Sequence, residues 1–258
     1  MSQKVGIVVP TLGIRPDFLK QCLESIKHAG NAHVCLVAPK NFNFKPQIEN
    51  GLANQFVVDP GTGLPDAINA GFSELPPEIE YINWLGDDDL LSAGSLGEAT
   101  KILDSDPNTV LVFGSCNYVD PTGKTIWTNR SGQWASVLLG FGPNLIPQPG
   151  ALFRRSAFDK VGKLRAEFKW AFDLDLLLNL KKVGRLKFIS QTLASFRWHP
   201  ESLTVEFRKN SVEEASRVRI LHLPRFLRTI SWLWEYPVKK VTFLAGLRVS
   251  QKAKKLTA

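Results

Sequence analysis

The sequence predicts an α/β protein with a Rossmann-like, mostly parallel sheet that is flanked by helices. Short apolar strands alternate with amphipathic helices through the first half of the chain, which is the pattern of a doubly wound sheet. The apolar, aromatic run at residues 81–85 leads into three adjacent carboxylates, Asp87, Asp88 and Asp89. Ligands of open α/β sheets bind at the carboxyl ends of the strands. We therefore expect the functional site around these acids.

The elements before the acids follow from apolar periodicity and from Gly and Pro punctuation. A buried strand ends at Pro10, and the helix after it stops at Gly30. Gly63 opens a later helix, which Pro76 closes. The expected elements are a strand at residues 5–9, a helix from about residue 17, strands at 34–37 and 56–58, and a helix after residue 63.

The second half continues this alternation. Residues 132–150 are rich in Gly and Pro, and they are either a mobile loop over the site or a plain surface connection. A capping box at Ser156 predicts a short helix that Gly162 ends. The other expected elements are a helix around residues 96–103, a strand at 110–113, a hairpin turn at 120–123, an apolar helix at 170–178, and strands at 186–189 and 193–198, before His199 and Pro200.

Two acids, Asp173 and Asp175, lie inside the apolar helix at residues 170–178. Positions two apart on a helix do not share a face, so we expect different surroundings for them. Asp173 lies among aromatic and leucine side chains, and partial burial there would raise its pKa. For Asp175, an ordinary exposed helical position is an equal alternative.

Composition describes an ordinary soluble globule of 258 residues, 44% hydrophobic and 22% charged. Three scattered cysteines, Cys22, Cys35 and Cys116, indicate a reducing compartment and no disulfide framework. The apolar run near the start is too short for a signal peptide, and no apolar run reaches membrane-spanning length. We therefore expect a cytoplasmic protein.

The net charge of +8 is concentrated in the last part of the chain. From Arg217 onward there are ten basic residues and one acid, Glu235, a net charge of +9. Apolar side chains alternate with these bases, as they do in helices that lie on anionic membranes. The alternative is that the apolar residues pack on the main domain while the bases stay in water. Pro224 and Pro237 are expected to break this segment into short pieces.

The acid triplet has two chemical interpretations. Adjacent carboxylates repel one another, so a desolvated cluster requires a cation. All-oxygen ligands suit Mg²⁺ or Mn²⁺, which in turn hold phosphates. A solvated turn is the alternative, because Asp is common in loops and caps helices.

Taken in order, the motifs resemble those of family-2 glycosyltransferases with the GT-A fold. The match spans roughly residues 3 to 205, and each motif alone is weak. They are Pro10-Thr11, Gly63-Leu64 with Asn69-Ala70-Gly71, the triplet Asp87-Asp88-Asp89, the segment from Gly150 to Gly162, Asp173 to Leu178, and Phe196-Arg197-Trp198-His199.

The resemblance implies an inverting, metal-assisted transfer of a sugar from a nucleotide-diphosphate sugar to a hydroxyl acceptor, with Mg²⁺ or Mn²⁺ as cofactor and a role in polysaccharide biosynthesis. Asp173 is then the general base. Asp88, with Asp89 and His199, is the expected metal ligand set. The residues expected to bind the nucleotide-sugar are Pro10, Thr11, Asn69, Asp87 and Asp88.

The sequence departs from the family pattern at two positions. The second strand ends in Ala38-Pro39 where the family has an Asp pair, and Ile68 stands where it has Arg before the Asn. Both changes leave the donor nucleotide open. A nucleotidyltransferase and a non-catalytic nucleotide- or glycan-binding protein on the same fold are the alternatives.

The expected organisation is a GT-A domain at residues 1–205 and a basic, amphipathic helical extension at 206–258. The expected partners are a nucleotide-sugar, a glycan or lipid-linked acceptor and an anionic membrane surface at the inner face of the membrane, but not nucleic acid. Trp134 and Trp170 are candidates for stacking on sugar rings, although core packing is the simpler role for each.

Overall fold

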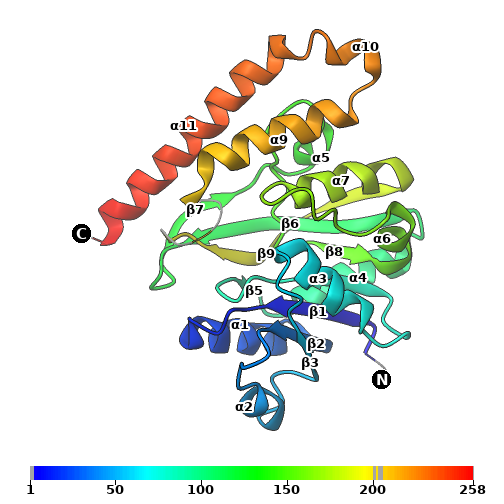
Figure 1. Cartoon of the computed structure of the whole chain (residues 1–258), viewed down its shortest axis with the longest axis vertical. Helices are drawn as coiled ribbons and strands as arrows, with labels where there is room; N and C mark the ends of the chain where they lie inside the picture. The colour runs from blue at the N-terminus through cyan, green and yellow to red at the C-terminus, as the bar shows by residue number, and fades with distance from the viewer. Residues whose placement is uncertain (1–2, 200–201, 203–205, 258) are drawn as a thin grey trace.

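The computed structural model of this chain describes residues 3–199, 202 and 206–257. Figure 1 shows one curled sheet with helices on both faces. Within the described residues the sheet has nine strands in the order β3-β2-β1-β4-β8-β6-β9-β5, with β7 paired to β6. The strands are β1 (Val5–Pro10), β2 (Ala32–Ala38), β3 (Gln55–Val58), β4 (Tyr81–Trp84), β5 (Leu90–Leu91), β6 (Thr109–Val119), β7 (Thr125–Asn129), β8 (Leu152–Arg154) and β9 (Arg185–Arg197).

The helices separate these strands in the expected alternation. Gly71 lets one of them approach the sheet closely, because a Cβ at this position would lie 2.6 Å from Val8 Cγ1 of β1. The helices are α1 (Pro16–Ala29), α2 (Lys45–Glu49), α3 (Leu64–Ser73), α4 (Ser95–Ser105), α5 (Trp134–Leu138), α6 (Arg155–Val161), α7 (Phe172–Val183), α9 (Arg208–His222), α10 (Arg225–Arg228) and α11 (Trp232–Thr257).

Strand directions confirm the predicted mostly parallel sheet. β1 is parallel to β2 and β4, and β2 is parallel to β3. β8 is antiparallel to both β4 and β6, so β6 runs in the same direction as β4, and β9 is parallel to β6. The predicted hairpin joins β6 to β7. The carboxyl ends of β1, β4, β6 and β9 therefore point to the same side of the sheet.

Two local expectations were wrong. The runs at residues 186–189 and 193–198 form one strand, β9, which bulges where Phe113 pairs with Phe188 but Ser115 pairs with Thr192. The bulge packs closely on Gly114, where a Cβ would lie 2.5 Å from the Gln191 carbonyl. The capping box at Ser156 is also absent, because α6 continues directly from β8 and begins at Arg155. Gly162 ends this helix in a left-handed conformation, as expected.

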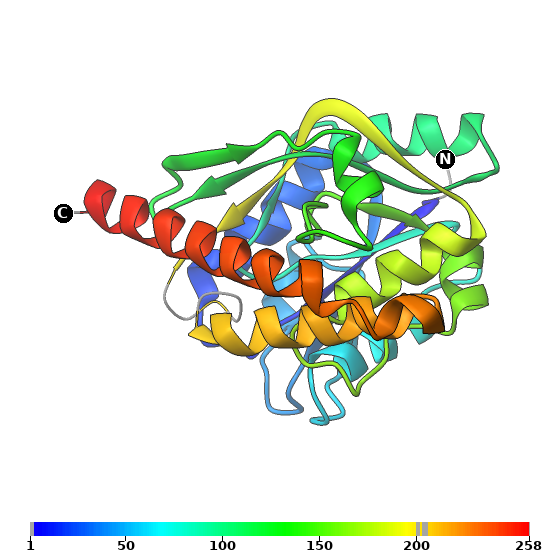
Figure 2. The ribbon, with the colours of Figure 1, turned by 90° about the horizontal axis from the view of Figure 1, so that it is seen from above.

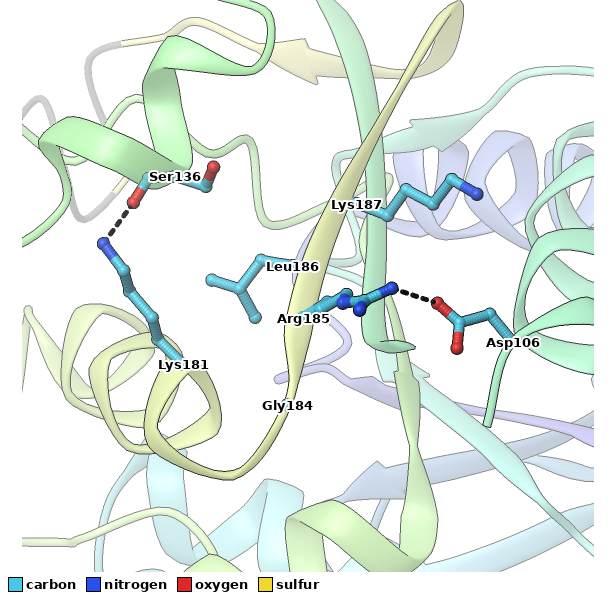
Figure 3. A pocket seen from close by; sticks show the side chains of 7 residues that line it. All are labelled: Asp106, Ser136, Lys181, Gly184, Arg185, Leu186 and Lys187. Carbon is cyan, nitrogen blue, oxygen red and sulfur yellow. Dashed lines mark hydrogen bonds and ion pairs between the residues drawn. The ribbon is translucent and has the colours of Figure 1, made fainter. Parts of the chain in front are cut away.

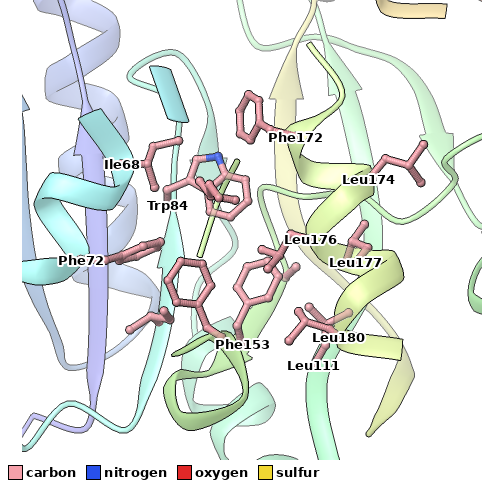
Figure 4. Packing of buried hydrophobic residues seen from close by; sticks show 14 of the residues in the cluster. Ile68, Phe72, Trp84, Leu111, Phe153, Phe172, Leu174, Leu176, Leu177 and Leu180 are labelled. Atoms are coloured by element: carbon pink, nitrogen blue, oxygen red, sulfur yellow. The ribbon is translucent and has the colours of Figure 1, made fainter. Parts of the chain in front are cut away.

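Aromatic rings join the two halves of the sheet. Trp84 of β4 stacks on Phe153 of β8 with ring centroids 5.5 Å apart, and it lies 5.9 Å from the ring of Phe172. Figure 4 shows these rings between α3 on one side and the leucines of α7 on the other. Ring pairs of this kind add about 0.5–1.5 kcal/mol beyond the burial of their area. They fix the start of α7 beside the end of β4.

The basic segment folds as helices that pack on the rest of the chain. α9 contacts α7, and α11 contacts α9 and β7 (Figures 1 and 2). Pro224 separates α9 from α10, as expected, but Pro237 lies inside α11, so the second expected break was wrong. None of the described helices is both long enough and apolar enough to cross a membrane. The expected domain boundary at residue 205, like Pro200, falls outside the described residues.

Candidate active site

The carboxyl ends of β1, β4 and β9 bring distant residues of the sequence together. Thr11 follows β1 and donates a hydrogen bond from Oγ1 to Asp87 Oδ2 at 2.5 Å. His199 follows β9, and its Nε2 lies 2.7 Å from Asp88 Oδ2. Thr11, Asp87, Asp88 and His199, four of the residues expected at the site, are thus neighbours.

Arg15 is a cation within this cluster. It lies in the loop between β1 and α1. Its guanidinium donates from Nη2 to Asp87 Oδ1 at 2.8 Å and from Nη1 to Asp88 Oδ2 at 2.9 Å. Its side chain remains 25% exposed. The guanidinium therefore bridges two of the three acids from the solvent side.

A second arginine contacts the acids from the protein interior. Arg197 is 1% exposed and donates from its backbone N–H to Asp89 Oδ1 at 3.0 Å and from Nε to the Asp88 carbonyl at 2.9 Å. Its guanidinium stacks over the Phe18 ring at 4.2 Å. The chain itself thus supplies part of the positive charge that the acid triplet requires. Sequence reasoning missed this role for both arginines.

The three acids have different electrostatic surroundings. Burial raises the pKa of Asp87, although the Thr11 hydrogen bond and Arg15 oppose the shift. Burial and the neighbouring Asp88 charge raise the pKa of Asp89 well above its ordinary value. Burial would raise the pKa of Asp88 too, but the His199 hydrogen bond and Arg15 outweigh it and lower this pKa. Asp88 is therefore the acid that stays ionised most readily.

The Asp88–His199 pair fits a divalent cation. His199 Nε2 lies within hydrogen-bonding distance of Asp88 Oδ2, which only accepts, and 3.0 Å from Arg15 Nη1, which only donates. One ring nitrogen cannot serve both partners at once. Arg15 Nε is moreover buried without a hydrogen-bond partner among the described residues. A cation between Asp88 and His199, with an anion at Arg15, would satisfy all three groups.

This pair supplies two ligands. Within the described part of the chain, no group of three or more His, Cys, Asp or Glu side chains is placed to hold a metal. Asp89 directs Oδ1 to the β9 backbone, so its expected role as a ligand stays a prediction. Carboxylate oxygen and imidazole nitrogen together suit Mn²⁺, and the other ligands would be diphosphate or water oxygens.

Asp173 lies in the first turn of α7, beside the end of β4. Its side chain is partly buried and accepts a hydrogen bond from Asn144 Nδ2 at 3.0 Å. Burial raises the pKa of Asp173 to about 6. This result agrees with the expected partial burial, and it places the pKa of the carboxyl close to the range useful for a general base.

Asp175 has the different surroundings that were expected, but the exposed alternative for it was wrong. It is 1% exposed and is held by both arms of Arg165 and by His222 Nε2, 2.7 Å from Oδ1. Burial alone would raise the pKa of Asp175, but these partners outweigh it and lower the pKa. Asp175 is thus a buried, paired anion.

Other expected site residues lie outside the acid cluster. The Asn69 amide is engaged by the Leu164 backbone, accepting from its N–H at 3.1 Å and donating to its carbonyl at 2.8 Å. Pro10 pairs with Val37 at the end of β1. Ile68 and Ala38, at the two positions of departure, are fully buried in the apolar core. Donor contacts of Asn69 and Pro10 stay predictions.

The segment at residues 132–150 contacts the end of β4 and the start of α7. Gln148 donates to the Trp84 carbonyl at 2.8 Å, and Asn144 contacts Asp173. Its mobility stays a prediction. Trp134 in α5 is 63% exposed, so the core-packing role expected for it was wrong. Trp170 is partly buried against Phe207, with ring centroids 5.9 Å apart.

A pocket of about 480 Å³ lies elsewhere (Figure 3). It opens at the amino end of β9, and none of the expected site residues lines it. The acid cluster lies at the opposite end of this 13-residue strand, in which each residue rises roughly 3.3 Å. The lining residues are Asp106, Ser136, Lys181, Gly184, Arg185, Leu186 and Lys187.

Sequence comparisons give one distant relative that has no described function. No protein-family model matches the chain. The chain is 26% identical over 224 residues to uncharacterized protein y4gI of Sinorhizobium fredii, which covers 83% of this chain but only 24% of that protein. The chain thus spans about a quarter of the length of this relative.

Two solved structures have the same architecture. The mannosyltransferase PcManGT of Pyrobaculum calidifontis, in complex with GDP-Man and Mn²⁺, matches with a TM-score of 0.65 at 16% identity, over 98% of this chain and 76% of that one. S. aureus TarS 1-349, in complex with UDP-GlcNAc, matches with a TM-score of 0.63 at 13% identity, over 85% and 66% of the two chains. The chain therefore has the GT-A fold that the motifs indicated.

Proposed function

We propose that this chain is an inverting, metal-assisted glycosyltransferase that moves a sugar from a nucleotide-diphosphate sugar to a hydroxyl acceptor. One observation carries the proposal. The Asp88 carboxylate with the neighbouring His199, and the partly buried Asp173 carboxyl, lie on the side of a GT-A sheet to which the strands point their carboxyl ends. The structural neighbours hold GDP-Man with Mn²⁺ and UDP-GlcNAc, which supports a donor of this chemical class.

The donor end of the site consists of Asp88, His199 and Arg15. Asp88 and His199 would hold the divalent ion, and such an ion neutralises charge on a departing diphosphate. Arg15 presents a partly exposed guanidinium beside them, and its fork geometry suits phosphate oxygens. The hydrogen bond from Thr11 to Asp87 fixes the end of β1 against the triplet. Asn69 and Pro10 remain candidates for donor contacts further from the acids.

The acceptor end is assigned to Asp173. The acceptor hydroxyl oxygen attacks the anomeric carbon from the face opposite the leaving group, and the bond from that carbon to the diphosphate oxygen breaks. The nucleoside diphosphate leaves with the bonding electron pair, and the hydroxyl proton passes to the Asp173 carboxylate. With a pKa of about 6, this carboxyl is mostly ionised at pH 7 and can accept the proton.

The test is release of nucleoside diphosphate from a panel of UDP- and GDP-sugars, with Mn²⁺, with Mg²⁺ and with excess EDTA. We expect release with at least one donor, dependent on the metal, and loss of it in Asp88→Ala. Asp159→Asn, an exposed acid of α6, is the matched control and should retain activity. Full turnover in EDTA or in Asp88→Ala would refute the metal assignment.

A binding protein without turnover is the second candidate function. Its support is that Arg15 and Arg197 already neutralise much of the acid cluster, and that Ile68 replaces an expected basic residue. Thermal-shift titration with nucleotide diphosphates separates the two functions, since a ligand that binds the native state raises Tm. A raised Tm without release of diphosphate from any donor would favour the binding protein.

The basic helices at the end of the chain suggest where the acceptor lies. α10 and α11 expose apolar and aromatic side chains, among them Phe226 at 73% and Trp232 at 66%. The acid of this segment, Glu235, is buried against Arg219, and among the described residues Lys239 is the other base from Arg217 onward that has an ion pair, with Glu213 of α9. These features support contact with an anionic membrane surface and a glycan or lipid-linked acceptor.

A further inference from the structure

Helix α9, which lies outside the motif-bearing part of the chain, contacts the start of the helix that carries Asp173. The Glu214 carboxylate accepts hydrogen bonds from three consecutive backbone N–H groups, those of Lys169 at 3.2 Å, Trp170 at 2.6 Å and Ala171 at 2.8 Å. Ala171 is the N-cap of α7 and has no side chain able to cap the helix. A residue from another helix therefore holds the N–H of this N-cap and the N–H groups of the two residues before it.

The Glu214 carboxylate has two effects on the start of α7, one on the helix and one on Asp173. The first N–H groups of a helix have no partner within the helix, and a carboxylate near them is favoured by the helix dipole. Here the same carboxylate also places a negative charge near Asp173, in the first turn of α7.

α9 holds α7 at a second point. His222 lies eight residues after Glu214, about two turns, and so on the same face of α9. Its Nε2 contacts Asp175 Oδ1 at 2.7 Å, and its Nδ1 lies 2.9 Å from Lys182 Nζ. Because the ammonium group only donates, this contact assigns the ring hydrogen to Nε2. α9 thus contacts both the first and the last turn of α7.

We infer that Glu214 is a positioning residue for the proposed base: it fixes the backbone just before Asp173 and brings a second carboxyl group near that of Asp173. This inference rests on the proposed role of Asp173. Glu214 does not need to touch substrate, because its effect passes through the backbone of residues 169–171 and through space.

The charged groups around Asp173 define the expected direction of the effect. Burial is the main cause of the raised pKa of Asp173, and the backbone N–H groups of the helix start and the Asn144 amide oppose it. Glu214 of α9 adds to the increase in this pKa, with a smaller effect than these groups. The Tyr118 hydroxyl of β6 also faces Asp173. The charge of Asp175 on the same helix is paired with Arg165, and His222 donates a hydrogen bond to it. Removing the Glu214 charge should therefore lower the pKa of Asp173.

The experiment is Glu214→Gln, which keeps the shape and one acceptor oxygen but removes the charge. Titration of the Asp173 carboxyl by ¹³C NMR should show a lower pKa, and the acidic limb of the pH–rate profile should move to lower pH. Transfer at pH 7 should fall by roughly ten- to a hundred-fold, with little change in the KM of the donor, because the base is displaced. Glu213→Gln, which changes the adjacent acid bound to Lys239, is the matched control.

Unchanged Asp173 titration and unchanged transfer in Glu214→Gln would overturn the inference. If this variant does not fold, Glu214→Asp keeps the charge and shortens the reach. Its rate should fall without a shift of the pH profile, and wild-type transfer by it would also overturn the inference. The NMR comparison requires no turnover. A wild-type protein that transfers no sugar therefore contradicts the proposed function and leaves the test of Glu214 intact.

Discussion

Arg15 and the proposed divalent cation would compete for the same oxygen, Asp88 Oδ2. Asp88 Oδ2 accepts from Arg15 Nη1 and lies within hydrogen-bonding distance of His199, so a metal at this oxygen must displace at least one of these contacts. Arg15 is the partner able to move, because its side chain is 25% exposed and it comes from a loop. A donor diphosphate provides a new partner for the displaced guanidinium. Metal and donor should therefore bind cooperatively.

The first prediction concerns this competition. Arg15→Ala removes a positive charge from the metal position, so Mn²⁺ should bind at least about tenfold more tightly without nucleotide. Donor KM should rise, because the diphosphate loses a partner. Electron paramagnetic resonance of free Mn²⁺ measures the first effect, and steady-state kinetics the second. Lys20→Ala on the exposed face of α1 is the control. Equal Mn²⁺ affinity in Arg15→Ala and the wild type would contradict the prediction.

The second prediction concerns Asp173. A carboxyl with a pKa of about 6 is an active base above this pH and an inactive acid below it. The rate should therefore rise as pH increases through about 6 and then level off. Asp173→Asn should reduce kcat by about 10²–10⁴-fold and remove this limb, while Tm and donor binding change little. Near-normal turnover by a folded Asp173→Asn protein would assign the base to another residue.

At the scale of elements, the helices and strands that were predicted from the sequence are those with a long hydrophobic pattern of their own. The long helices α1, α3 and α7 and the buried strands β1 and β4 were predicted, because each carries its own periodic signal. β5 and β8 have two and three residues, and such strands exist only because of their sheet partners. The ion pairs of Arg15 also depend on contacts between distant parts of the chain. They were not predicted because 72 residues separate Arg15 from Asp87.

The third prediction concerns the contact between α9 and α11. Arg219 and Glu235 are each 3% exposed and form two hydrogen bonds, at 2.8 and 2.6 Å. Glu235→Gln leaves a buried cation without its counter-charge, which costs roughly 3–5 kcal/mol. The double variant Arg219→Met with Glu235→Leu should be close to neutral. Urea unfolding measures both. Glu213→Gln, in an exposed pair with Lys239, should cost about 0–1 kcal/mol.

If the loss in Glu235→Gln is no larger than that in Glu213→Gln, α11 does not depend on this pair. Hydrogen exchange would then show whether α11 separates from α9 locally, before the sheet unfolds.

On the scale of the whole molecule, the near-neutral body and the basic helices are not independent parts. α9 binds the N-cap N–H of α7 through Glu214 and reaches Asp175 through His222, so the segment that the sequence set apart as an extension contacts the helix that carries Asp173. α11 crosses the molecule on its outer side (Figures 1 and 2). Its inner face packs on α9, and its outer face carries apolar side chains and bases. This arrangement leaves a surface rich in bases and apolar side chains beside a helix that also contacts the start of α7, where the proposed base lies.

The last prediction is that this outer face binds anionic membranes. A second copy of the chain would bring two strongly basic surfaces together, whereas anionic lipid attracts them by about 1 kcal/mol for each base near the surface. In flotation assays the protein should bind phosphatidylglycerol vesicles, lose binding at high salt, and ignore neutral phosphatidylcholine vesicles. Trp232→Ser should weaken binding, because an exposed interfacial aromatic is lost. Trp127→Ser on β7 is the matched control, since Trp127 is also exposed but lies outside α10 and α11. Equal recovery with neutral and anionic vesicles, or no binding to either, would contradict the prediction.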